Sequence, residues 1–269
     1  MQVDTHTHVI ADDPARYPLD PRPGAGPWFR NAPYTVEGLL DEMAAARVDR
    51  AVLVQAVSAY RHDNRYVTDS ARAHPDRCTS VACLDLAVPD AFERLRHLAR
   101  ERGVRGLRWW ALDGQSLGEP RAVWDELARL GLPVVVTLFA DRLEELLALV
   151  PSLPPVPIAI DHCAFADLSA GVPDVLVALA AQPTVYWKVS TIVLDGLAEH
   201  GDVRDGVAEL SRCLGADRLL WGSDFSQTHD RPYADLAELA RHAAEKLDDD
   251  ARAGFLGTNA LGLWPELAP

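Results

Sequence analysis

The chain has 269 residues, of which 48% are hydrophobic and 25% charged, and this length suits one globular domain spanning residues 1–269. A formal net charge of −14, an isoelectric point near 5.0 and the lack of any Lys/Arg cluster argue against nucleic acid and anionic membranes as partners. Because the four cysteines form no CxxC pair and no secretory signal precedes the first strand, we expect a cytoplasmic protein.

Short apolar runs bounded by Gly, Pro or Asp alternate along the chain with longer segments of helical period, which is typical of parallel strands covered by helices. Strands are predicted at residues 3–8, 50–55, 79–84, 104–109, 133–138, 157–161, 185–189 and 219–223. Helices are predicted at residues 36–46, 90–101, 121–130, 142–150, 174–181, 203–214 and 233–246. Eight units in strict alternation, without a GxGxxG fingerprint, favour a (β/α)8 barrel over an open doubly wound sheet.

Three segments are predicted to be loops at the catalytic face, since each follows a strand. They are residues 11–33, which are rich in Pro, Gly and Arg, and residues 111–119 and 227–232. Residues 248–264 are expected to form a closing helix packed outside the barrel.

The strongest chemical signal is the sequence Asp-Thr-His-Thr-His at the end of the first strand. Residues two apart on a strand point to the same face, so His6 and His8 are expected to project together at the barrel mouth. Two convergent imidazoles bind a metal or position a water molecule. HxH alone is a weak motif, but the C-terminal end of a barrel strand is where catalytic groups lie.

Two further strands end in candidate groups. The apolar run before Asp161 and His162 brings a third imidazole to the same rim, where it acts in catalysis or simply bonds a loop. The last strand runs into Asp224, which would lie beside the first strand once the barrel closes. Asp224 is a candidate general base, a metal ligand or both, and its alternative role is that of a turn or helix-capping residue.

Motifs in the expected order resemble the lactonase branch of the amidohydrolase superfamily, which includes 2-pyrone-4,6-dicarboxylate lactonase and the sugar-acid lactonases. They are DTHTHV, YPLDP, DRAVLVQ, VRGLRWW, DHC, WKVS and WGSDF, and they run from the first strand to the eighth.

This resemblance implies a barrel hydrolase in which Asp224 deprotonates the attacking water, with His6, His8 and His162 as the other catalytic residues. Two-metal members carry a bridging Lys or Glu on the fourth strand, whereas this chain has Arg108 within Leu-Arg-Trp. We therefore expect either a metal-independent reaction or a single divalent ion held by His6, His8 and Asp224. Zinc is the ion that we expect first.

Substrate contacts are expected from side chains near other strand ends. Alternation allows only one of Arg105 and Arg108 to face the barrel interior, and Arg108 lies nearer the catalytic end. Its fork suits a carboxylate or an oxyanion, while a structural ion pair is the alternative for either arginine and for Lys188. The substrate-binding candidates are Arg108, Arg105, Lys188, Gln55, Ser190 and Trp109, and Trp28 and Trp110 are further candidates for the pocket wall.

The predicted function is hydrolysis of a small-molecule lactone by a water molecule that Asp224 activates. The alternatives are a metal-dependent decarboxylase or amide hydrolase on the same scaffold, and a non-catalytic barrel that binds a ligand. No GxSxG elbow indicates a serine nucleophile. The chain is expected to act as a monomer or a homodimer.

Overall fold

The computed structural model describes residues 1–269 and contains one eight-stranded parallel sheet in chain order. The strands are β1 Val3–Thr7, β2 Arg50–Val54, β3 Cys78–Cys83, β4 Leu107–Trp110, β5 Val134–Thr137, β6 Ile158–Ile160, β7 Val185–Ser190 and β8 Leu219–Gly222. The sheet closes where β1 meets the end of β8, since the His8 amide donates to the Phe225 carbonyl and the Asp224 amide to the His6 carbonyl. The predicted (β/α)8 barrel is confirmed.

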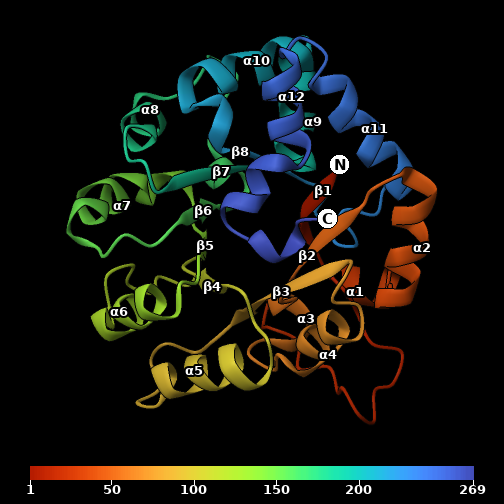
Figure 1. Cartoon of the computed structure of the whole chain (residues 1–269), viewed down its shortest axis with the longest axis vertical. Helices are drawn as coiled ribbons and strands as arrows, with labels where there is room; N and C mark the ends of the chain where they lie inside the picture. The colour runs from red at the N-terminus through yellow and green to blue at the C-terminus, as the bar shows by residue number, and fades with distance from the viewer.

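Helices surround the strands in chain order, as the colour sequence around Figure 1 shows. They are α1 Trp28–Asn31, α2 Val36–Ala46, α3 Val57–Tyr60, α4 Arg65–Ala73, α5 Ala91–Glu101, α6 Arg121–Leu130, α7 Leu143–Leu149, α8 Asp174–Ala180, α9 Thr191–His200, α10 Val203–Leu214, α11 Tyr233–Ala243 and α12 Asp249–Leu256. The seven predicted helices are present, whereas α1, α3, α4 and α9 were not predicted. None of the helices combines the length and apolar character needed to cross a bilayer.

Two apolar layers stabilise the barrel. The larger one lies between the sheet and the helices, where Trp109 of β4 stacks on Trp124 of α6 at a ring distance of 4.9 Å. The smaller one fills the barrel interior, with Val52, Val81 and Val135 at its centre. Strands β2, β5, β6 and β8 are apolar along most of their length and buried on both faces, whereas β1 and β3 also carry buried polar residues before their catalytic ends.

The C-terminal segment departs from its prediction. Helix α12 does pack outside the barrel, but the chain then turns inward, and Ala260, Leu263, Trp264 and Leu267 join the interior cluster. In Figure 1 this blue segment lies over the middle of the ring of helices. It closes the end of the barrel opposite the catalytic face, where the Trp264 indole donates to the Arg105 carbonyl just before β4 and the apolar side chains are removed from water.

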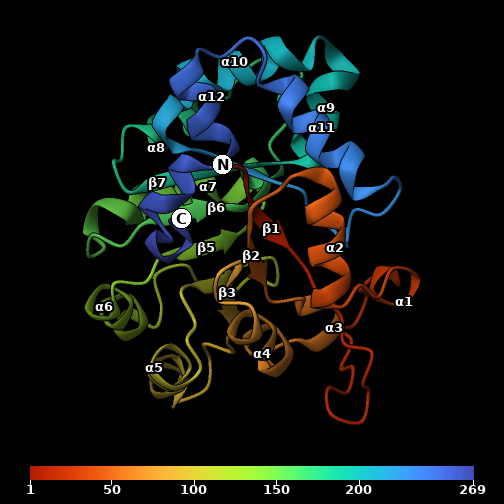
Figure 2. The same cartoon turned by 45° about the vertical axis from the view of Figure 1, so that its right-hand side comes forward.

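The long loop after β1 is anchored, not loose. Tyr17, Trp28 and Phe29 bury against Ala59 and Tyr60 of α3, and Figure 2 shows α1 and the preceding loop beside α3. This packing brings Arg22 and Trp28 to the mouth of the barrel, where Leu112 and Gln227 of the other two predicted loops also lie. The three loops therefore gather at the catalytic face as predicted.

Candidate active site

The junction of β1 and β8 fixes the first histidine pair. Asp4 is buried and accepts bonds from the Ser223 amide at 2.9 Å and from the Tyr233 hydroxyl at 3.0 Å, which ties the two strands to α11. Burial raises the pKa of Asp4 to about 6. Gly222 permits the close approach of β1, since a Cβ atom added there would lie 2.7 Å from the His6 Cβ. Neither Asp4 nor Gly222 was singled out from the sequence.

The four predicted catalytic residues come together at this junction. The His6 and His8 rings lie 5.0 Å apart, and the His6 and His162 rings 4.7 Å apart. Asp224 Oδ1 lies 3.6 Å from His6 Nε2 and 3.5 Å from His8 Nε2. All four side chains are at most 3% exposed. Residues far apart in the sequence thus form one cluster.

The atoms that meet in this cluster are electron-pair donors without hydrogen-bond partners. His8 Nδ1 lies 2.8 Å from the Val54 carbonyl, so it carries the proton and its Nε2 carries a free electron pair. His6 Nε2 and Asp224 Oδ1 are buried and have no hydrogen-bond partner. Two imidazole nitrogens and a carboxylate oxygen within 4.8 Å of one another fit a single divalent cation, with positions left open.

Asp224 carries a negative charge. Burial alone would raise its pKa, but the adjacent imidazoles of His8, His162 and His6 outweigh burial and lower the pKa to about 2. The backbone at Asp224 is left-handed, with φ of 59°, which turns the side chain from the strand toward the histidines. An ionised carboxylate suits both roles predicted for this residue, general base and metal ligand.

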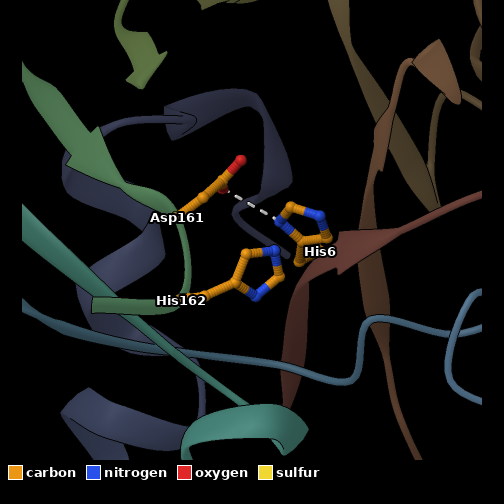
Figure 3. A group of neighbouring side chains, drawn as sticks. All are labelled: His6, Asp161 and His162. Atoms are coloured by element: carbon orange, nitrogen blue, oxygen red, sulfur yellow. Dashed lines mark ion pairs between the residues drawn. The ribbon is translucent and has the colours of Figure 1, made fainter. Parts of the chain in front are cut away.

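Asp161 is a central residue of the site that sequence reasoning did not assign. Its Oδ1 lies 3.0 Å from His6 Nδ1 and 3.3 Å from Lys188 Nζ, while Oδ2 accepts from Arg108 Nη2 at 3.1 Å and from the Thr137 hydroxyl at 2.6 Å. Figure 3 shows the Asp161 carboxylate directed at the His6 ring from the end of β6. The sequence signal was a carboxylate ending an apolar strand directly before His162.

The charges around Asp161 decide its state. Burial would raise its pKa, but the neighbouring His6, Lys188 and Arg108 hold this pKa well below its usual range. Burial also lowers the pKa of His6 well below its ordinary value, so His6 is neutral at pH 7. His6 Nδ1 lies between Asp161 Oδ1, at 3.0 Å, and Lys188 Nζ, at 3.2 Å, so the opposite ring nitrogen, Nε2, faces Asp224.

His162 is oriented by Ser190. Its Nδ1 lies 2.7 Å from the Ser190 hydroxyl, and burial lowers the His162 pKa. Figure 3 shows its ring beside that of His6. Residues 162–165 all have left-handed φ values, between 47° and 59°, so the chain turns sharply after β6 and places His162 over the cluster. Ser190, predicted to bind substrate, contacts His162 instead.

The two arginine candidates separate as alternation requires. Arg108 faces the interior, where it bonds Asp161 and the Gln55 carbonyl and lines the cavity at the mouth. Arg105 precedes β4, is exposed, and donates to the backbone carbonyls of Ala99 and Val104. The expectation that Arg105 contacts substrate is therefore corrected.

Three other predicted substrate contacts are also placed elsewhere. Trp109 faces the helices. Trp110, the next residue of β4, points to the barrel interior and lines the cavity instead. The Gln55 amide donates to the Arg61 and Asp63 carbonyls and so holds the loop after β2. Lys188 points inward but lies beneath the cavity, fully buried against Asp161.

A cavity of about 170 Å3 lies at the barrel mouth above this cluster. His8 and His162 form part of its floor, Arg108 and Arg22 supply positive charge, and Trp28, Trp110 and Phe165 are among its walls. Arg22 comes from the long loop, where its guanidinium pairs with Asp113 and lies 5.5 Å from the Trp110 ring. This volume suits a compact ring compound and is smaller than usual drug-sized pockets.

Comparisons with known proteins identify the family of this chain. The family model described as amidohydrolase matches residues 3–265. L-fucono-1,5-lactonase from Burkholderia ambifaria is 29% identical over 245 residues, covering 85% of this chain and 83% of that protein.

Two solved structures share the fold. A protein from Pseudomonas putida, described as a candidate 2-pyrone-4,6-dicarboxylic acid hydrolase, has a TM-score of 0.79 at 24% identity, covering 100% of this chain and 98% of that one. An amidohydrolase from Burkholderia multivorans with bound zinc has a TM-score of 0.75 at 20% identity, covering 98% and 99%. The chain therefore belongs to the amidohydrolase family of enzymes.

Proposed function

We propose that this enzyme hydrolyses a lactone in the cavity above His6, His8, His162 and Asp224. The observation that carries the proposal is the ionised Asp224 carboxylate beside the inward-facing nitrogens of His6 and His8. Resemblance to L-fucono-1,5-lactonase over most of both chains supports a lactone as the substrate.

Substrate binding falls to the cationic and aromatic side chains of the cavity. Arg108 is held by Asp161, Thr137 and the Gln55 carbonyl, so its guanidinium is fixed before substrate arrives. A fixed guanidinium gains more from a developing negative charge than a mobile one does, because no reorganisation accompanies the reaction. Arg22, on the loop, suits a polar or acidic substituent of the substrate.

The proton transfers begin and end at Asp224. Asp224 takes a proton from water, and the hydroxide attacks the lactone carbonyl carbon. His162, oriented by Ser190, and Arg108 stabilise the oxyanion of the tetrahedral intermediate. When the ring C–O bond breaks, Asp224 returns the proton to the leaving oxygen, so no covalent enzyme intermediate forms.

The cluster also fits one metal ion, and zinc is our proposed occupant, with His6, His8 and Asp224 as its ligands. Bound there, zinc would supply Lewis acidity that polarises a carbonyl and lowers the pKa of water. Asp161 then acts through His6, since its contact with Nδ1 fixes which nitrogen faces the site. We further propose a cytoplasmic location, which the four unpaired cysteines support.

A turnover screen tests this function. Purified protein is offered sugar-acid, aliphatic and pyrone lactones, and release of acid is followed with wild type and Asp224→Asn. We expect turnover of at least one lactone, and a loss of at least about 100-fold in kcat in the variant. Carbon dioxide release from an aromatic acid without lactone turnover would instead support the decarboxylase alternative, and an equally active variant would refute the role of Asp224.

A further inference from the structure

Three of the six large hydrophobic side chains exposed on the protein gather on one side of the barrel mouth. Phe139 follows β5, Phe165 follows β6 and Ile192 follows β7, and they are 49%, 37% and 41% exposed. The Phe139 and Phe165 rings lie 5.4 Å apart. Because β5, β6 and β7 are neighbours in the sheet, these side chains form one apolar rim. A clustered apolar patch marks a binding surface more often than scattered residues do.

A second cavity, of about 180 Å3, lies at this rim, and we call it the apolar cleft. Its apolar lining is Phe165, Ala166, Leu168, Ile192, Val193 and Leu197. No arginine or lysine contributes to the cleft, and its polar residues other than His162 are exposed. Gly196 of α9 forms part of the wall, where an added Cβ would meet no atom within 4 Å. The cleft is thus suited to an uncharged, apolar group.

The apolar cleft adjoins the catalytic cavity. Both are lined by His162 and Phe165, whose rings lie 4.8 Å apart. The left-handed turn of residues 162–165 brings these two rings to the boundary between the cavities. A group attached to a ring held over His162 therefore reaches the cleft by passing Phe165.

We propose that the apolar cleft binds an uncharged apolar substituent of the substrate, so that the enzyme acts on a lactone carrying an alkyl or aryl arm. This inference rests on the proposed lactonase function and narrows its substrate class. The catalytic cavity holds the lactone ring itself, with Arg22 and Arg108 in reach of its polar groups. The arm gains by leaving water for the space beside Ile192 and Leu197.

A homologous series of γ-lactones with side chains from methyl to pentyl tests the proposal. We expect kcat/KM to rise about fourfold with each methylene buried in the cleft. Gly196→Leu fills the cleft and is expected to abolish this rise while leaving kcat/KM of the methyl lactone unchanged. Gly196→Ala is the matched control, because its methyl group has free space, and it should retain the rise. Ile192→Ser should weaken the rise without blocking the cleft.

The outcomes separate the two proposals. Hydrolysis of the methyl lactone or of sugar-acid lactones without any rise along the series, or a rise that persists in Gly196→Leu, would overturn the cleft proposal alone. Failure to hydrolyse any lactone would overturn the proposed function and the cleft with it. Sedimentation that reveals a dimer lost in Ile192→Ser, with a flat lactone series, would assign the rim to a second copy of the chain and refute the substrate arm.

Discussion

Replacing Asp161 by Asn is predicted to destabilise the barrel through the two cations that this carboxylate neutralises. The Arg108 and Lys188 side chains that face Asp161 are 5% and 0% exposed, so neither charge regains water when its partner is removed. Breaking a buried ion pair in this way costs about 3–5 kcal/mol. Burial already lowers the pKa of Lys188, so loss of its proton would relieve part of this cost, and we expect about 3 kcal/mol.

Urea unfolding followed by circular dichroism at pH 7.5 measures this loss. The pKa of Asp161 lies below its unfolded value, so its contribution is complete above about pH 4 and is lost only as the pH falls further. The part of the difference that comes from Asp161 itself is therefore constant from pH 5 to pH 8, and loss of the Lys188 proton in the variant should make the total difference shrink as the pH rises.

Two variants act as controls. Asp161→Asn/Lys188→Met removes the stranded ammonium group and should recover part of the stability. Asp90→Asn removes a carboxylate paired with Arg94 on the surface and should leave the urea midpoint unchanged. A midpoint for Asp161→Asn equal to that of Asp90→Asn would refute this reasoning.

Three further predictions concern other parts of the molecule. In Gly222→Ala the added methyl group would lie 2.7 Å from the His6 Cβ. We expect this variant to lose about 1–3 kcal/mol of stability and about 100-fold in kcat. Wild-type kinetics in this variant would contradict the close packing of β8 against His6. Hydrogen bonds from Arg129 lower the pKa of Glu126 to about 2, so Glu126→Gln should cost about 1 kcal/mol at pH 6, with the gap to wild type closing as the pH falls from 4.5 toward 2. A stability difference between wild type and Glu126→Gln that grows as the pH falls would contradict a lowered pKa of Glu126. Chelation should remove about one zinc ion per chain and lower kcat, and His8→Ala should bind less zinc; full activity of metal-free protein would exclude the metal role.

Strand positions could be predicted from the sequence because strands buried on both faces are apolar runs bounded by Gly, Pro and Asp. The catalytic cluster followed from the same pattern, since barrel geometry brings strand ends together whatever their separation in the chain. His6 and His8 were found by their spacing at the end of the first strand, and His162 and Asp224 because each follows an apolar strand. Asp161 also follows an apolar strand, but the sequence analysis assigned the catalytic role at this strand end to its neighbour His162 alone.

The remaining errors have physical causes. Once Arg108 faces the interior, alternation directs Arg105 and Trp109 outward, so parity alone removes both from the site. The inward turn of the C-terminal segment depends on an open barrel end that Trp264 fills, and this contact is invisible in the linear pattern. Arg22 belongs to a loop whose path is set by aromatic burial against α3.

The most direct test of water attack at this site is isotope labelling during turnover. A lactone identified in the screen is hydrolysed in water enriched in oxygen-18, and the product is analysed by mass spectrometry. Attack on the carbonyl carbon predicts one labelled oxygen in the carboxylate and none in the released hydroxyl group. Label in the hydroxyl group, or an unlabelled product, would contradict attack by a water molecule that Asp224 activates.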